Sequence, residues 1–89
     1  MRAIVTVLGK DRVGIISALS AILADSQVNI LDITQTTMQD IFTMVMVTDI
    51  SKCIIPFDKL ADELGKKGEN LGLKVALQHE DIFNSMHRI

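Results

Sequence analysis

The stretch RAIVTVLGKDRVGIISAL, residues 2–19, contains the transition that decides the fold of this chain. Residues 2–8 are rich in β-branched and apolar side chains, which predicts a β-strand. From Ile15 the apolar residues recur at three- and four-residue spacing, which predicts an amphipathic helix that ends near Ser26. Between them lie two glycines and three charged residues, at positions 9–14. We expect this segment to form the turn from strand to helix.

Two further strands are expected after this helix. Residues 28–39 return to β character, and several threonines occupy the second half of that run. Gln39-Asp40 is a plausible tight turn, although it contains no glycine. Residues 41–47 form the next apolar, β-branched run. The pattern therefore predicts a hairpin in the middle of the chain.

The second half of the chain predicts another helix and another strand. Pro56, the only proline, suits the first turn of a helix. Gly65 and Gly68 weaken the end of this helix, and a stop by Asn70 is expected. Residues 73–77 then alternate between apolar and polar side chains, which is typical of a half-buried strand. Apolar residues near the C-terminus suggest a short last helix, at positions 82–86.

The predicted order of elements is therefore βαββαβ. Right-handed crossovers place both helices on one face of a four-stranded antiparallel sheet, which is the ferredoxin-like arrangement of the α+β class. A chain of 89 residues is expected to form a single domain, over residues 1–89. A domain of this size has a thin core, so association with another chain would add useful burial.

The strand at residues 42–47 also predicts that something covers the other face of the sheet. Phe42, Met44 and Met46 share one face, whereas Val45 and Val47 lie on the opposite face. A two-layer domain covers only one face of an antiparallel sheet, so the second face is normally polar. We therefore expect a homo-oligomer, most simply a homodimer.

Composition excludes several classes of partner. Nine Lys and Arg against eleven Asp and Glu give a net charge of −2, and only three aromatic residues are present, which argues against nucleic acid. No apolar run approaches the roughly 20 residues that a membrane helix needs. Met1-Arg2 leads directly into a strand pattern, without a signal sequence. The single cysteine, Cys53, cannot form an internal disulfide, so a cytoplasmic location is expected.

The turn at residues 9–14 has features of an anion site. The start of a helix offers free N–H groups and the positive end of the helix dipole. Asp11 is placed to cap the helix by accepting from the N–H of Val13 or Gly14. Lys10 and Arg12 would add donors for an anion. We expect Gly14 to allow close approach of a ligand, so that Gly14→Val harms binding more than folding. From these residues alone, a plain turn with a helix cap remains the alternative.

The stretch GKDRVGIISALSAILADSQVNILDITQT, residues 9–36, resembles the opening of an ACT domain, the small ligand-sensing module of amino-acid metabolism. The family pattern is a strand, then Gly-x-Asp-Arg-Pro-Gly, a helix, and Val-Asn-Ile at the start of the second strand. The match is most specific at residues 9–15 and 28–30. It departs at Val13, where many members have proline. The chain is most similar to stand-alone ACT proteins, and next to ACT domains of the glycine-cleavage-system repressor type.

The resemblance implies that the chain binds a small molecule, usually an amino acid, and does not transform it. ACT domains commonly pair, and their ligands lie at the interface. One wall of the site would then consist of Leu8, Gly9, Lys10, Asp11, Arg12, Val13, Gly14 and Ile15. The other wall, from the partner chain, would consist of Asn29, Ile30 and Leu31. The carboxylate of an amino acid would meet the first-turn N–H groups, and its ammonium group could be accepted by the Asn29 amide.

The same residues allow other functions to be compared with ligand sensing. A ligand-free dimerisation or protein-interaction adaptor is the main alternative. An acylphosphatase-like hydrolase would use Arg12 and Asn29, but the longer glycine-rich phosphate loop of that enzyme is missing. Cys53 stands alone, which argues against a copper chaperone. His79 and His87 are expected to be exposed and not to bind a metal. No catalytic constellation, cofactor site or metal site is predicted.

Overall fold

The computed structural model describes residues 1–10 and 14–81. The elements follow one another as β1 (Arg2–Lys10), α1 (Ile15–Asp25), β2 (Asn29–Met38), β3 (Ile41–Asp49), α2 (Phe57–Asn70) and β4 (Lys74–His79). This order confirms the predicted βαββαβ pattern. The helix expected at residues 82–86 lies outside the described residues. Neither α1 nor α2 has the length and apolar character to span a membrane.

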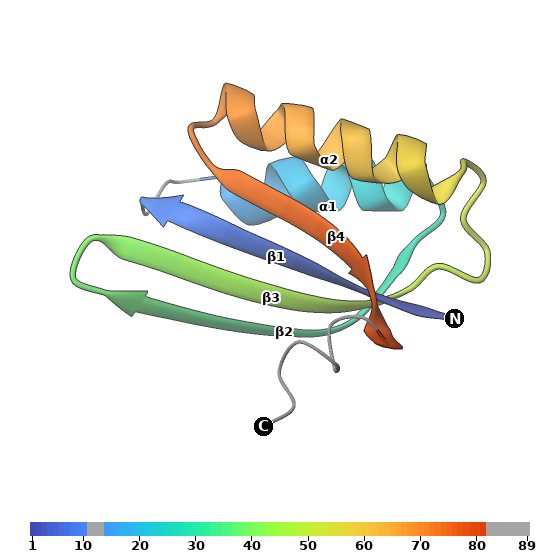
Figure 1. The fold of residues 1–89 in the computed structure, drawn as a ribbon, viewed down its shortest axis with the longest axis horizontal. Helices are drawn as coiled ribbons and strands as arrows, with labels where there is room; N and C mark the ends of the chain where they lie inside the picture. The colour runs from blue at the N-terminus through green and yellow to red at the C-terminus, as the bar shows by residue number, and fades with distance from the viewer. Residues whose placement is uncertain (11–13, 82–89) are drawn as a thin grey trace.

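The four strands form one antiparallel sheet in the order β2-β3-β1-β4. Both described helices lie on the same side of it (Figure 1). The predicted ferredoxin-like fold is therefore confirmed. The central strand β1 pairs with β3 over its whole length, from Arg2 opposite Asp49 to Lys10 opposite Ile41. This register fixes which residues stand at each end of the sheet.

The strands β1 and β3 extend slightly beyond their predicted limits, whereas β2 lies within its own. β1 continues to Lys10 and β3 to Asp49, because each finds a partner residue there in the antiparallel register. The tight turn at Gln39-Asp40 is confirmed, although no glycine is present. Gln39 itself adopts a positive φ of 55°, which is a conformation that polar residues tolerate better than β-branched ones.

The core lies between the sheet and the helices. Alternate side chains of β3, those of Phe42, Met44 and Met46, face the helices and are buried. The side chains between them point to the opposite side of the sheet, which we call the open face. This face consists of Ile4, Thr6, Leu8 and the residues paired with them in neighbouring strands. Fully buried side chains of the core come from every layer: Val5, Val7, Leu19, Leu23, Met44, Met46, Leu60 and Leu64.

Gly68 has a packing role that the sequence did not reveal. The two glycines were expected to weaken the end of α2, and the predicted stop by Asn70 is confirmed. Gly68 is buried against β4, and a Cβ there would lie 2.5 Å from Cγ2 of Val75. A Cβ on Gly65 would meet no atom within 4 Å. Gly68 therefore lets the last turns of α2 approach the sheet closely.

This difference gives a matched pair of substitutions. Gly68→Ala should destabilise the protein relative to Gly65→Ala by about 1–3 kcal/mol, because overpacking costs that much. Both changes gain the same helix propensity, roughly 1 kcal/mol, so the comparison isolates the contact with Val75. The free energies of unfolding from urea titration measure the difference. Equal values for the two variants would show that α2 does not need a glycine at its contact with β4.

Candidate ligand site

The helix α1 begins directly after Gly14. Gly14 occupies the N-cap position, and the first helical hydrogen bond runs from the N–H of Ala18 to its carbonyl, at 2.9 Å. The prediction that Asp11 is the N-cap residue is therefore wrong, whereas the predicted start of the helix at Ile15 is confirmed. Asp11, Arg12 and Val13 themselves lie outside the described residues. The N–H groups at the start of α1 have no partner within the helix and point out of its positive end.

The backbone conformation at position 14 favours a glycine. Its φ of 87° lies in the left-handed region, which side-chain-bearing residues rarely adopt. The expectation that Gly14→Val would cost little in folding is therefore wrong. The space beside Gly14 is nevertheless open, since an added Cβ would meet nothing within 4 Å. The start of α1 thus combines N–H groups that have no partner within the helix with open space beside Gly14.

The residues on either side of the turn point in different directions. Leu8 and Lys10 project from the open face of β1, and the Leu8 side chain is about half exposed. Gly9 lies on the helix side, where a Cβ would stand 2.5 Å from Cδ2 of Leu73. The small size of Gly9 therefore serves packing against Leu73. Ile15 is buried in the core and anchors the first turn of α1.

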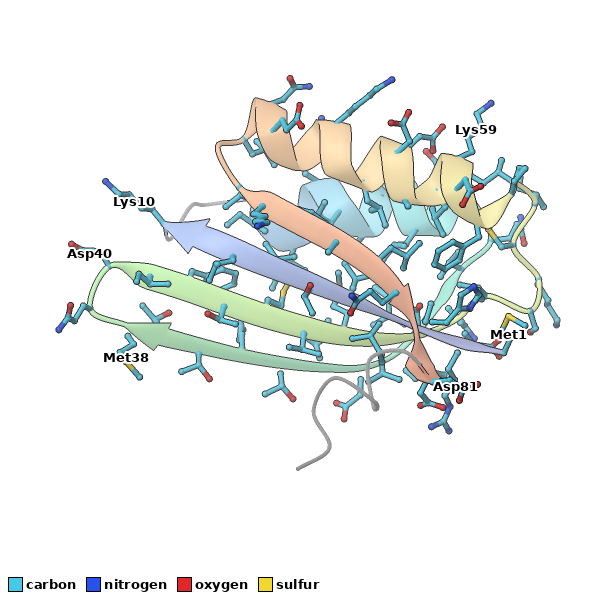
Figure 2. All side chains as sticks on the ribbon, in the orientation of Figure 1. Met1, Lys10, Met38, Asp40, Lys59 and Asp81 are labelled. Carbon is cyan, nitrogen blue, oxygen red and sulfur yellow. The ribbon has the colours of Figure 1, made fainter. Side chains whose placement is uncertain are left out.

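The second predicted wall lies at the other end of the sheet. Asn29 pairs with Asp49, which in turn pairs with Arg2 at the start of β1. Six strand residues separate the level of Arg2 from that of Leu8, which corresponds to about 20 Å. Figure 2 shows Met1 and Lys10 at these opposite ends. Within one chain, residues 29–31 therefore cannot complete a small site beside Gly14.

The three residues of this second wall differ in exposure. Asn29 is exposed and Ile30 is half-buried. Leu31 is exposed at a break in the register of β2, where Ile30 pairs with Thr48 and Asp32 already pairs with Val47. A β-bulge of this kind turns a side chain away from the regular alternation of a strand. Asn29 and Leu31 are therefore both available to a partner chain.

A polar hollow of about 260 Å³ lies beside Asn29, and sequence reasoning missed it. Its lining residues are Gln27, Asn29, Asp49, Ser51 and Lys52. These residues come from the α1–β2 connection, from β2, and from the end of β3 with the turn after it. They are separated in sequence by about 20 positions, so only the pairing of Asn29 with Asp49 reveals them as neighbours. Another hollow, lined partly by Lys10 and Asp40, lies at the far end of the sheet.

The hollow beside Asn29 holds a stable negative charge. Hydrogen bonds from the backbone N–H and the side chain of Ser51 keep the pKa of Asp49 below its usual value, and the N-terminal amine and Lys52 add to this effect. The backbone N–H of Ser51 lies 2.9 Å from Oδ1 of Asp49. Asp49 therefore stays ionised at neutral pH. A carboxylate beside an amide oxygen suits a ligand that carries an ammonium group.

The alternative chemistries find little support in this geometry. Asn29 stands at the opposite end of the sheet from Lys10 and Gly14, which flank Arg12, so an acylphosphatase-like pair does not meet within one chain. His79 was expected to be exposed. It is instead half-buried and stacked on Phe57, with the ring centroids 4.1 Å apart. In the part of the chain that the structure describes, no three His, Cys, Asp or Glu side chains gather as metal ligands.

The chain belongs to the ACT domain family, whose model matches residues 2–78. A UPF0237 protein of Clostridium acetobutylicum is 55% identical over 89 residues, which covers 100% of both chains. The solved structure of an ACT domain protein from Streptococcus pneumoniae shares 38% identity and a TM-score of 0.80, and covers 98% of each chain. A putative glycine cleavage system transcriptional repressor has the same fold, at 20% identity and a TM-score of 0.65 over 86% of this chain and 44% of its own.

These similarities confirm the family resemblance of the sequence. ACT domains are in general regulatory domains that bind small ligands, and they commonly dimerise. The range that the family model matches includes both predicted walls, residues 8–15 and 29–31.

The backbone requirement at Gly14 predicts a graded response to substitution. Gly14→Ala should lower the free energy of unfolding by about 1–2 kcal/mol, which is the penalty for a left-handed L-residue. Gly14→Asn should cost clearly less, because asparagine tolerates this region. No steric clash confounds the comparison, since the space beside Gly14 is open. Urea titration of both variants measures the effect, and equal losses for Ala and Asn would contradict it.

Proposed function

We propose that this chain is a regulatory domain that senses an amino acid, or a similar small metabolite, at the interface of a homodimer. The observation that carries the proposal is the placement of the two walls at opposite ends of one sheet. A two-fold symmetric dimer can bring the Gly14 end of one chain to the Asn29 end of the other. Membership of the ACT family supports a small ligand at such an interface.

The chemistry of the two walls fits the two ends of an amino acid. The carboxylate would accept hydrogen bonds from the N–H groups at the start of α1, with Lys10 and Arg12 nearby. The ammonium group would lie against Asn29 of the partner subunit, in the hollow where Asp49 is held ionised. The ammonium group would share Asp49 with the N-terminal amine, which lies 3.8 Å from that carboxylate, and with Lys52, which also lines the hollow.

The proposal covers the whole chain as one non-enzymatic domain, residues 1–89, without cofactor or nucleic acid, in the cytoplasm. The single cysteine and the net charge of −2 support this setting. The adaptor alternative shares the dimer but needs no ligand. A ligand-binding measurement therefore separates the two functions.

A thermal-shift screen of the full chain against the twenty amino acids tests the proposal. A ligand at a thousandfold excess over its Kd should stabilise the folded protein by about 4 kcal/mol. We expect one amino acid, or a small chemical group of them, to raise Tm clearly. If none raises Tm at millimolar concentration, the adaptor is the better function.

Arg12→Ala then tests the anion wall. It should weaken the amino acid found in the screen by about tenfold to a hundredfold, because a charge-assisted hydrogen bond contributes roughly 1.5–3 kcal/mol. Its free energy of unfolding should barely change, since isolated surface charges contribute little. Lys59→Ala, on the solvent side of α2, is the matched control and should bind normally. Calorimetry measures both affinities. Normal binding by Arg12→Ala would remove that residue from the site.

A further inference from the structure

The helix α1 ends in a motif that favours glycine, yet the chain has a glutamine there. The N–H of Val28 donates to the carbonyl of Leu23 at 2.8 Å, and the N–H of Gln27 donates to the carbonyl of Ala24 at 3.1 Å. This pair of hydrogen bonds defines a Schellman motif, in which the residue after the C-cap is left-handed. Gln27 is that residue, and its φ is 64°.

The helix α2 ends in the same motif, with the glycine that the motif favours. The N–H of Leu73 donates to the carbonyl of Gly68 at 2.7 Å, and the N–H of Gly72 donates to the carbonyl of Glu69 at 3.1 Å. Gly72 has a φ of 74°. Glycine is usual at this position because it has no Cβ to crowd the backbone. Of the two equivalent positions, the one at Gln27 therefore carries the residue that the backbone disfavours.

The side chain of Gln27 does not compensate for this within the chain. It is exposed, and among the described residues no group forms a hydrogen bond with its amide. The side chain instead lines the polar hollow beside Asn29. A residue that departs from the local backbone preference is expected at a functional site more than elsewhere. The side chain of Gln27 is thus better explained by the hollow than by the fold.

The lining of the hollow carries balanced charges. Asp49 and Lys52 have opposite charges, whereas Gln27, Asn29 and Ser51 carry neutral groups that both donate and accept hydrogen bonds. An apolar group placed here would leave the two amides without hydrogen-bond partners. A further formal charge would disturb the balance between the carboxylate and the ammonium group. The hollow therefore suits a neutral polar group.

The size of the hollow fits one part of a small ligand. Its volume is about 260 Å³, whereas complete small-molecule sites occupy roughly 300–1,000 Å³. The hollow has room for the ammonium group and a short side chain of an amino acid. The carboxylate would then extend to the start of α1 in the partner subunit, as in the proposed function.

We infer that Gln27 binds the ligand and selects amino acids whose side chain ends in a hydroxyl or a carboxamide. Such a group both donates and accepts, so it can pair with the Gln27 amide and with the Ser51 hydroxyl. The ammonium group lies against Asn29 and Asp49. This inference rests on the proposed function and adds the chemical class of the ligand's side chain.

Gln27→Gly tests whether the glutamine serves the ligand or the fold. It should raise Tm by about 4–8 °C, because glycine relieves the left-handed conformation. Gly72→Gln makes the reverse exchange at the matching position of α2 and should lower Tm. Gln27→Asn keeps an amide and tolerates the left-handed region, so it should fold at least as stably as the native chain.

Binding is measured by calorimetry with four pairs of free amino acids of similar shape. Serine is compared with alanine, threonine with valine, asparagine with leucine, and glutamine with methionine. At least one polar member should bind, at least about tenfold more tightly than its apolar counterpart. Gln27→Gly should weaken that polar amino acid by about threefold to tenfold, which is the loss of one neutral hydrogen bond. Gln27→Asn should recover part of the affinity.

Each way in which the inference can fail leaves a distinct result. If Gln27→Gly binds as well as the native chain, Gln27 only ends a helix, and the proposed function stands. If Gln27→Gly is no more stable than the native chain, the glutamine is not disfavoured and the premise is lost. Binding of only apolar or only charged amino acids would overturn the selected class but keep the chain an amino-acid sensor. Binding of none of the twenty would overturn the proposed function as well.

Discussion

The antiparallel pairing of the central strand β1 with β3 is the constraint on which the rest of the structure depends. Nine consecutive pairs, from Arg2 with Asp49 to Lys10 with Ile41, fix the strand-to-helix turn at one end of the sheet. The same register places Asn29 at the other end, through its pairing with Asp49. Because a strand is stiff and extended, these ends stay about 20 Å or more apart. A ligand site that uses both ends therefore requires two chains.

Much of the fold could be predicted from periodicity, because one side of each element is buried. The helical spacing after Ile15 and the alternation at residues 73–77 both mark faces that contact the core. Element limits were less predictable, since they depend on which partner residues a strand finds. The role of Gly68 was hidden for the same reason, because its contact with Val75 joins α2 to β4. Its sequence position alone suggested only a weak helix end.

The candidate site was only partly predictable. The motif at residues 9–15 is local, so the sequence located the strand-to-helix turn correctly. The helix start at Ile15 was predicted, but the capping residue was missed because a left-handed glycine, Gly14, replaces a side-chain cap there. The charge beside Asn29 was missed because Asp49 is distant in sequence and becomes its neighbour only through β2–β3 pairing. Long-range pairing, and not local propensity, decides what surrounds each wall.

The claim that two chains complete one site is tested most directly by mixing two defective variants. Arg12→Ala and Asn29→Ala should each bind the amino acid weakly when alone. In a mixed dimer, one site combines an intact Arg12 with an intact Asn29 from the other chain. After joint unfolding and refolding, calorimetry should show normal affinity at about a quarter of the sites, as random pairing of a symmetric dimer requires. A mixture that exchanges subunits but binds no better than either variant alone would contradict a shared site.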